Sequence, residues 1–392
     1  MGCLIIPNGE PGVENPMNTF LPVENGDTLK SLQGFFKTLL ESKTVEALLL
    51  PMRTPAGTIS PALVVDPSAL ASADPLAPIM TVNTATLAGK LSVKKPRPKV
   101  GVVLRSCEAR ALIELTKMQQ ANLADLVIIS IDCAGTVSVP DYVSMNGAGV
   151  NLWQELFQQA AASPENPANN IRQACKICEQ PVYSPRPETD ISIQLFGYNI
   201  HQQIGVTLPD GLAGNLGFQA AEPSLERAGT VEKLVALRIA ARDEEFAAIR
   251  LRLEDKQNGS TSGLQSVFAA CIRCHNCMNV CPICYCKTCV FKSHIFDHEP
   301  DQYVKWAHAK GAFRMPSDTM LFHLTRLNHM VLSCVGCGTC TEACPSELPV
   351  GTVFRAIGQK VQETFEYMPG RSVEEQLPLI TFKADEWTEV GE

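Results

Sequence analysis

Residues 271–282 read CIRCHNCMNVCP and residues 334–345 read CVGCGTCTEACP, so one cysteine spacing occurs twice in the chain. Both copies follow C-x2-C-x2-C-x3-C-P, the cysteine run of bacterial ferredoxins. The first three thiolates of a run can bind three corners of an iron–sulfur cubane, and the proline then ends the loop. A single run could be a zinc knuckle, but two copies in one chain favour iron–sulfur clusters. We therefore interpret the C-terminal part of the chain as an electron-transfer domain.

The fourth corner of each cubane must come from outside its own three cysteines. In two-cluster proteins the fourth cysteine of each run ligates the other cluster. The rule predicts one cluster on Cys271, Cys274, Cys277 and Cys344, and another on Cys334, Cys337, Cys340 and Cys281. Helical apolar patterns cover 318–332 and 350–365, with Ser317 as a candidate N-cap. Residues 264–392 are therefore interpreted as an α-helical ferredoxin domain, the type found in succinate dehydrogenase iron–sulfur subunits and heterodisulfide reductase small subunits.

Length, charge and cysteine content restrict the class of protein. The chain has 392 residues, enough for two or three domains, and its formal net charge of −8 argues against a nucleic-acid or anionic-membrane surface. No apolar stretch approaches the roughly 18–20 residues of a membrane span, and we expect no signal peptide in the first residues. The 16 cysteines point to metal ligation rather than disulfides. We expect a reducing, anaerobic cytoplasm as the setting.

The part before the ferredoxin runs has the pattern of an α/β fold. Residues 1–95 are interpreted as an N-terminal α/β region and residues 96–258 as a further α/β domain, with a linker over 256–263. Helices are expected at 29–42, 108–120 and 231–253, and strands at 45–50, 58–65, 99–104, 126–131 and 190–196. The strands over 99–104 and 126–131 are apolar throughout, which predicts buried, parallel neighbours.

Four further cysteines follow predicted strands or lie in predicted loops of this α/β part. Cys107 and Cys133 lie just past the ends of the two buried strands, where ligands bind in open α/β sheets, and Cys175 and Cys178 form a C-x2-C. We interpret these four as ligands of a third [4Fe–4S] cluster, with zinc as the alternative. Each cysteine alone could be a small buried apolar residue.

Cys284, Cys286 and Cys289 follow the first run too densely for chance. They are either ligands of a further metal site or thiols that surround the first cluster. No fourth ligand is evident from the spacing. His294 and His298 lie nearby, but histidines are more often surface or core residues than ligands. Cys3 is interpreted as incidental.

The motifs together resemble the beta subunits of coenzyme F-420 hydrogenases and formate dehydrogenases. The resemblance is carried by SCEARAL over 106–112, by Asp132-Cys133 at a strand end, and by Cys175-x2-Cys178 with TDIS over 189–192. The formate dehydrogenase branch is also similar over 271–289 and in LTRLNHM over 324–330, which leads into the second run. The overlap begins near residue 20 and covers most of the chain.

The resemblance implies a non-covalent FAD in the α/β part beside the third cluster. No G-x-G-x-x-G is present, so the flavin is expected on the family likeness alone, with Arg105, Ser106 and Arg110 near its phosphates. The implied function is an electron-transfer subunit that splits or assembles a hydride at FAD and relays single electrons through three [4Fe–4S] clusters. The implied partner is a catalytic subunit of the formate dehydrogenase, hydrogenase or heterodisulfide reductase kind. The implied two-electron carrier is a deazaflavin or another such molecule.

Two other classes are compatible with the cysteine content. The first is a flavin-free iron–sulfur relay without a substrate site. The second is a zinc-stapled scaffold, which fits the repeated four-cysteine runs poorly.

Overall fold

The computed structural model describes residues 16–93, 98–147, 151–165, 167, 168, 170–187, 189–254, 263–311 and 318–378. The expected N-cap Ser317, the residue Cys3 and the expected linker up to residue 262 lie outside these ranges. Within them, no helix combines the length and apolar character needed to cross a membrane.

A seven-stranded mixed sheet forms the N-terminal part, in the order β1-β7-β6-β5-β4-β2-β3. Its strands are β1 Met17–Pro22, β2 Ala47–Arg53, β3 Ile59–Val64, β4 Val100–Arg105, β5 Leu126–Ile131, β6 Ile191–Gln194 and β7 Gln203–Leu208. The four central strands β2, β4, β5 and β6 run parallel, and β1, β3 and β7 pair antiparallel with their neighbours. The expected parallel pairing of the strands over 99–104 and 126–131 is confirmed.

Helices cover both faces of the sheet. The N-terminal helices are α1 Thr28–Glu41, α2 Ala85–Ser92, α3 Ser106–Lys117, α4 Val139–Gly147, α5 Leu152–Ala162, α6 Gln173–Lys176 and α7 Asp210–Asn215. On β4, Val103 packs into the core that contains α1, whereas Val102 and Leu104 pack into the core that contains α2 and α3. A strand buried on both faces needs an unbroken apolar run, which is why β4 and β5 were recognisable from sequence.

The ends of β5 and β6 are fixed by one buried carboxylate. Asp132 accepts hydrogen bonds from the backbone N–H groups of Leu195 and Phe196, at 2.8 and 3.0 Å. Its other oxygen accepts from the Arg227 guanidinium at 3.0 Å. These side-chain bonds replace the sheet ladder, so β6 ends at Gln194 rather than at the expected residue 196.

The C-terminal part is helical. Its helices are α9 Leu264–Val267, α10 Asn276–Asn279, α11 Pro300–Lys310, α12 Thr319–Met330, α13 Thr339–Glu342 and α14 Val350–Thr364. Two short 3-10 helices, η3 Val290–Lys292 and η4 His294–Phe296, lie in this part, whereas η1 Glu24–Gly26 and η2 Pro67–Ser72 lie in the N-terminal part. The helices predicted over 318–332 and 350–365 are confirmed as α12 and α14. Asp318, which precedes α12, pairs with Arg273 at 2.7 Å instead of capping the helix.

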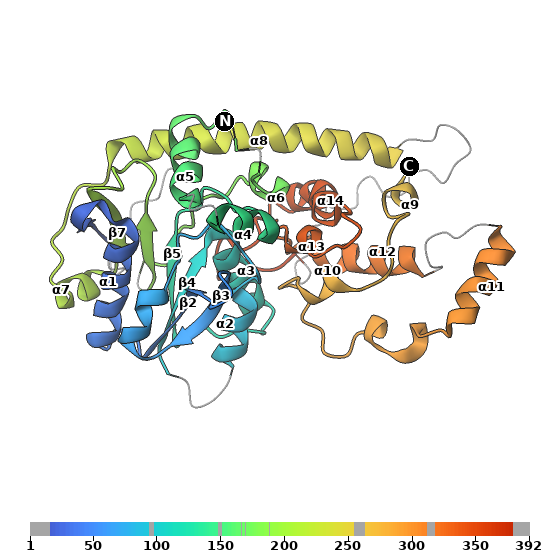
Figure 1. Ribbon diagram of the computed structural model, residues 1–392, viewed down its shortest axis with the longest axis horizontal. Helices are drawn as coiled ribbons and strands as arrows, with labels where there is room; N and C mark the ends of the chain where they lie inside the picture. The colour runs from blue at the N-terminus through green and yellow to red at the C-terminus, as the bar shows by residue number, and fades with distance from the viewer. Residues whose placement is uncertain are drawn as a thin grey trace.

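One long helix spans both parts of the chain. Helix α8, Leu225–Glu254, runs along the sheet domain and continues over the C-terminal helices (Figure 1). Phe246 and Ile249 on α8 pack in one core with Phe354 on α14 and Phe322 on α12. The helix expected over 231–253 is therefore confirmed and begins earlier. The two parts share an apolar core as well as a covalent connection.

Candidate iron–sulfur centres

The four cysteines of the α/β part lie together at the carboxyl edge of the sheet. Cys107 is in the first turn of α3, directly after β4, and Cys133 follows β5. Cys175 lies on α6, and Cys178 donates its backbone N–H to the Cys175 carbonyl at 3.3 Å. Burial raises the pKa of Cys133 to about 11; Arg105 opposes the shift, and Cys175 and Cys178 add to it. The structure thus brings together all four cysteines of the first set (Cys107, Cys133, Cys175 and Cys178).

Cationic and hydroxyl groups surround this first set. Thr136 Oγ1 lies 3.3 Å from the Cys175 sulfur, and an Arg172 guanidinium nitrogen lies 3.9 Å from it. Burial opposes ionisation of Cys175, but Arg172 and Thr136 outweigh it and lower the pKa of this thiol. Arg238 reaches the same region from α8 and donates to the Ala134 carbonyl at 2.5 Å. These groups would stabilise thiolates and a cluster of negative charge.

The structure groups the fourth cysteine of the first run with the first three cysteines of the second run. Cys281 from the first run lines one hollow with Cys334, Cys337 and Cys340 from the second run. Burial raises the pKa of Cys340 well above its usual range, and the thiolates of Cys281, Cys337 and Cys334 raise it further. We call these four residues the second set. Four cysteine sulfurs around one hollow are the ligand set of a cationic metal centre, which fits an iron cluster.

The remaining four cysteines of the runs form the third set (Cys271, Cys274, Cys277 and Cys344). Burial raises the pKa of Cys277 to about 11; Arg326 opposes the shift, and Cys271, Cys344 and Cys274 add to it. The Cys274 side chain is exposed, whereas Cys277 is buried. This set therefore lies nearer to solvent than the second set does.

Buried nitrogen donors contact the cysteines of the third set. Arg326 on α12 donates to the Cys277 sulfur and to the Cys277 carbonyl, both at 3.1 Å. His323 Nε2 lies 3.3 Å from the Cys271 sulfur, and burial lowers the pKa of His323 to about 3, so the ring is neutral. The backbone N–H of Arg273 donates to the same sulfur at 3.4 Å. Hydrogen bonds of this kind set the potential of a bound cluster.

Several of these donors have spare hydrogen-bonding capacity. Among the described residues, buried side-chain nitrogens without a hydrogen-bond partner include Arg172 Nε, Arg273 Nε, Arg326 Nε and His323 Nδ1. Each belongs to a residue that contacts a cysteine of the first or third set. An unpartnered buried donor is costly, and the inorganic sulfides of a cluster are acceptors. The donor chemistry of the sites therefore fits [4Fe–4S] clusters.

Both ferredoxin loops share one backbone conformation that the sequence satisfies in two ways. The two residues that flank the second cysteine of each run are left-handed: φ is 56° at Arg273 and 60° at His275, and 74° at Gly336 and 73° at Gly338. Only the second run uses glycine, which adopts this region at little cost. Gly338 also faces the α/β part, because a Cβ there would collide with Ala174, whereas a Cβ on Gly336 would lie 2.7 Å from Arg355 Nε on α14. The second run is thus pressed against the first set.

Cys284, Cys286 and Cys289 lie beside the runs near Arg326. Burial raises the pKa of Cys284; Arg326 opposes the shift, and Cys289 and Cys286 add to it, so the three thiols are neighbours. Cys286 is exposed. Within the part of the chain that the structure describes, no group of three His, Cys, Asp or Glu side chains has the geometry to hold a single metal ion. The role of these three cysteines stays a prediction.

The residues expected near flavin phosphates have partners within the chain. Arg105 donates to the Ala77 carbonyl at 2.6 Å, and Ser106 donates to the Val182 carbonyl at 3.0 Å. Arg110 donates to Pro369 at 2.8 Å and to Val335 at 3.3 Å, so its guanidinium faces the C-terminal part. Of the three, only Arg105 also lines a hollow beside Cys133. Their flavin contacts remain predictions.

Two neighbouring hollows lie at the same sheet edge. The hollow beside Cys133 is lined by Trp153, Phe157 and Leu195 as well as Arg105. Trp153 and Pro78 also border a larger, more polar hollow that reaches Arg53 and Asp27. Aromatic and apolar walls near a thiol set, continuing into a polar hollow, fit an isoalloxazine ring with a polar tail.

Sequence reasoning missed the arginines that connect the cysteine sets. Arg172 and Arg355 carry no local signal, because their partners lie far away in the chain. Arg326 lies inside the LTRLNHM segment that carries the family resemblance, and this was the one available sign of its importance.

Comparison with known proteins defines the class first. Residues 266–348 match the family model of a 4Fe–4S dicluster domain, the stretch that contains both runs. The chain therefore carries an iron–sulfur domain of the two-cluster kind.

Two relatives then specify the type of subunit. The F420-dependent formate dehydrogenase subunit beta of Methanocaldococcus jannaschii is 24% identical over 313 residues, covering 72% of this chain and 76% of the relative. The F420-dependent formate dehydrogenase 1 subunit beta of Methanococcus maripaludis is 23% identical over 311 residues, covering 71% and 74%. The resemblance and the oxidoreductase-subunit class expected from the sequence are confirmed. A chain from the solved F420-reducing [NiFe] hydrogenase complex of Methanosarcina barkeri aligns at a TM-score of 0.39 and 12% identity, over 62% of this chain and 96% of that one.

Proposed function

We propose that the chain is an electron-transfer subunit of an oxidoreductase complex, with three [4Fe–4S] clusters and one non-covalent FAD. The observation that carries the proposal is that the three cysteine sets adjoin one another. Ala174, which directly precedes the first-set residue Cys175, lines the same hollow as the second set. Thr339, beside Cys340, donates to the carbonyl of Val280, beside Cys281, at 3.4 Å and so ties the two runs together. Arg326 also lines that hollow and donates to Cys277, so the third set adjoins the second, with the hollow beside Cys133 at one end of the series and the exposed Cys274 at the other.

The series suits a change between two-electron and one-electron chemistry. When bound, a flavin can exchange electrons in pairs with a hydride carrier and singly with a [4Fe–4S] cluster, so their adjacency would serve the splitting or assembly of a hydride. The residues of the chain hold the cofactors, exclude water around the second set and supply the cationic donors described above. The relatives' names support the deazaflavin F420 as the two-electron carrier and a formate dehydrogenase catalytic subunit as the partner.

Cofactor content tests the proposal. The full chain, purified without oxygen, is expected to contain about 12 iron atoms with matching acid-labile sulfide, and to release FAD on denaturation. Iron near 8 without flavin would favour the flavin-free relay over the proposed function. A colourless, zinc-containing protein would reject both.

The hydrogen bonds from Arg326 are expected to raise the potential of the third-set cluster. Replacing Arg326 with Met removes a cation that favours the reduced, more negative cluster, so we expect the midpoint potential to fall by about 60 mV, a factor of ten for a one-electron couple. Arg326→Lys should retain part of the effect. The measurement is an EPR-monitored redox titration.

Arg250→Met is the matched control for this titration. Its buried guanidinium donates to Ala356 and Gln359, at 3.0 and 2.9 Å, and not to a cysteine of the runs. The control should leave all potentials in place. An unchanged potential in Arg326→Met with full iron content would show that Arg326 serves packing alone.

A further inference from the structure

Three arginines, of which Arg110 and Arg172 are buried, connect the first set to the second run. Arg110 on α3 donates to the Val335 carbonyl at 3.3 Å, and Arg172 donates to the Cys337 carbonyl at 3.0 Å. In the opposite direction, Arg355 on α14 donates to the Ile177 carbonyl at 3.1 Å and to both Glu179 oxygens, at 2.7 and 2.6 Å. Every bond therefore joins a segment that carries a first-set cysteine to the second run or to the helix that follows it.

We propose that Arg172 is a positioning residue that fixes the gap between the first and second cysteine sets, with Arg110 and Arg355 securing either side. The inference rests on the proposed function for its purpose, because the gap is the one across which electrons would pass. The position of Arg172 between the two sets is given by the hydrogen bonds within this chain and does not depend on the proposed function.

Arg172 contacts both sides of the gap. It immediately precedes α6, where its backbone N–H donates to Thr136 and its guanidinium lies 3.9 Å from the Cys175 sulfur. The same guanidinium nitrogen holds the carbonyl of Cys337. The side chain of Arg172 is enclosed, with only 6% of the residue exposed. A guanidinium is suited to this task because its planar donors act in fixed directions.

The contact point of the two sets is Cys337. The absence of a side chain at Gly338 lets the loop after Cys337 approach Ala174 on α6. Loss of Arg172 would release the Cys337 carbonyl and so free this residue of the second set from the segment that carries Cys175.

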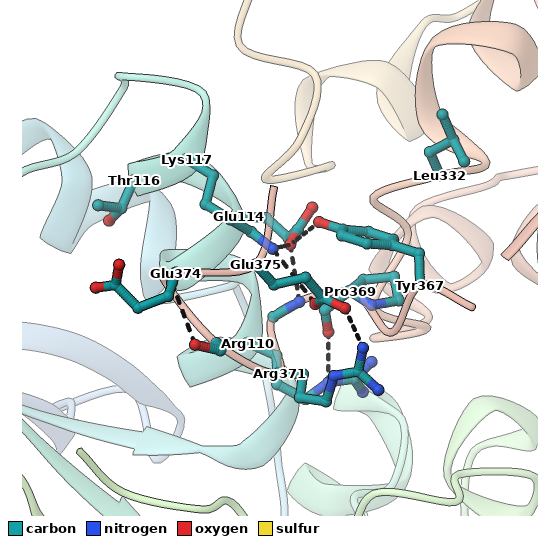
Figure 2. Close-up of polar contacts among 12 residues, drawn as sticks. Arg110, Glu114, Thr116, Lys117, Leu332, Tyr367, Pro369, Arg371, Glu374 and Glu375 are labelled. Carbon is teal, nitrogen blue, oxygen red and sulfur yellow. Dashed lines mark hydrogen bonds and ion pairs between the residues drawn. The ribbon is translucent and has the colours of Figure 1, made fainter. Parts of the chain in front are cut away.

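The C-terminal strap, residues 365–378, secures Arg110. Figure 2 shows Arg110 beside Pro369, with Glu114 and Tyr367 of the same network close by. Arg110 Nε donates to the Pro369 carbonyl at 2.8 Å while its Nη1 reaches Val335. Gly370, at φ 73°, packs directly on the Arg110 backbone, where any Cβ would collide. The strap therefore holds the arginine that faces the second run.

Hydrogen exchange and EPR of the full chain, purified without oxygen, test the proposal in the variants Arg172→Met and Arg172→Lys. Loss of a charge-assisted hydrogen bond predicts about 10- to 100-fold faster exchange of the amides over 335–340 in Arg172→Met. Iron content should stay at the wild-type value. The magnetic interaction between neighbouring reduced clusters should weaken. Arg172→Lys keeps the charge, so its exchange rate over 335–340 and its magnetic interaction should lie between those of wild type and Arg172→Met.

Arg250→Met is again the control, because it removes an arginine-to-carbonyl bond between α8 and α14 without touching a cysteine set. It should leave the 335–340 amides at wild-type exchange. Wild-type exchange over 335–340 in both Arg172 variants would overturn the inference, as would equal acceleration in the control. If Arg172→Met fails to fold, Arg172→Lys decides by the same two readouts. The exchange readout needs no cluster, so a wild-type protein without iron would reject the proposed function and leave this test intact.

Discussion

Cys281→Ser is expected to remove the cluster of the second run, although Cys281 belongs to the first. Cys281 lines the hollow of Cys334, Cys337 and Cys340, and the Cys337 and Cys334 thiolates add to the burial that raises its pKa to about 12. Serine keeps the size of the side chain but is a poor ligand for iron. We expect a loss of about four iron atoms per chain, with one EPR signal missing after reduction.

Double variants show which cysteines share a cluster. Adding Cys334→Ser to Cys281→Ser should cost no further iron, because the same cluster is already lost. Adding Cys271→Ser instead should raise the total loss to about eight iron atoms. Cys289→Ser serves as a control outside the three sets. The opposite pattern, with Cys281 and Cys271 non-additive, would mean that each run ligates its own cluster.

Glu114→Ala is expected to destabilise the folded chain strongly. Glu114 is fully buried on α3 and accepts hydrogen bonds from Tyr367 Oη at 2.6 Å and from the Gly370 N–H at 2.8 Å (Figure 2). It also pairs with Lys117 at 2.9 Å, whose side chain is only 5% exposed. Removing the carboxylate leaves a buried ammonium without its main partner, which costs about 3–5 kcal/mol.

The stability loss is measured as the shift in the urea unfolding midpoint under anoxic conditions. We also expect faster proteolysis of the strap, because Tyr367 and Gly370 lose their shared acceptor. Arg371→Ala is the control: its half-exposed guanidinium pairs with Glu375, so a change below about 1 kcal/mol is expected. A similarly small change in Glu114→Ala would show that Glu375, 3.8 Å from Lys117, compensates for the missing charge.

The sequence predicted those elements of the fold whose signal lies within a short segment of the chain. The apolar runs of β4 and β5, the amphipathic helix α1 and the cysteine spacings each carry their signal within a few residues. The pairing of strands at the sheet edges has no such local signal. Strand β1 pairs with β7, with Met17 opposite Leu208, and no local pattern identifies a partner so distant in the chain.

In the candidate sites, too, the residues with a local sequence signal were predicted and those with distant partners were not. The cysteines of the three sets were named from spacing and from strand ends, and the structure brings each set together. Arg110 was expected near a flavin because it follows Cys107 on α3. Its actual partners, Val335 and Pro369, are backbone carbonyls, and a carbonyl is offered by every residue type. Single-sequence reasoning therefore had no means of finding the contacts of Arg110 or Arg172.

Insertions and deletions within helix α8 are not tolerated between the residues that anchor its two ends. Arg227 near its first turn is bound to Asp132 beside the first set, and Arg250 near its last turn is bound to Ala356 on α14. One residue added or removed between them would rotate one end by about 100° and shift it by about 1.5 Å. Either the sheet or the ferredoxin helices would then lose their anchor. The amino acids along this helix can change, but their number must stay constant because it sets the spacing between the two halves of the protein.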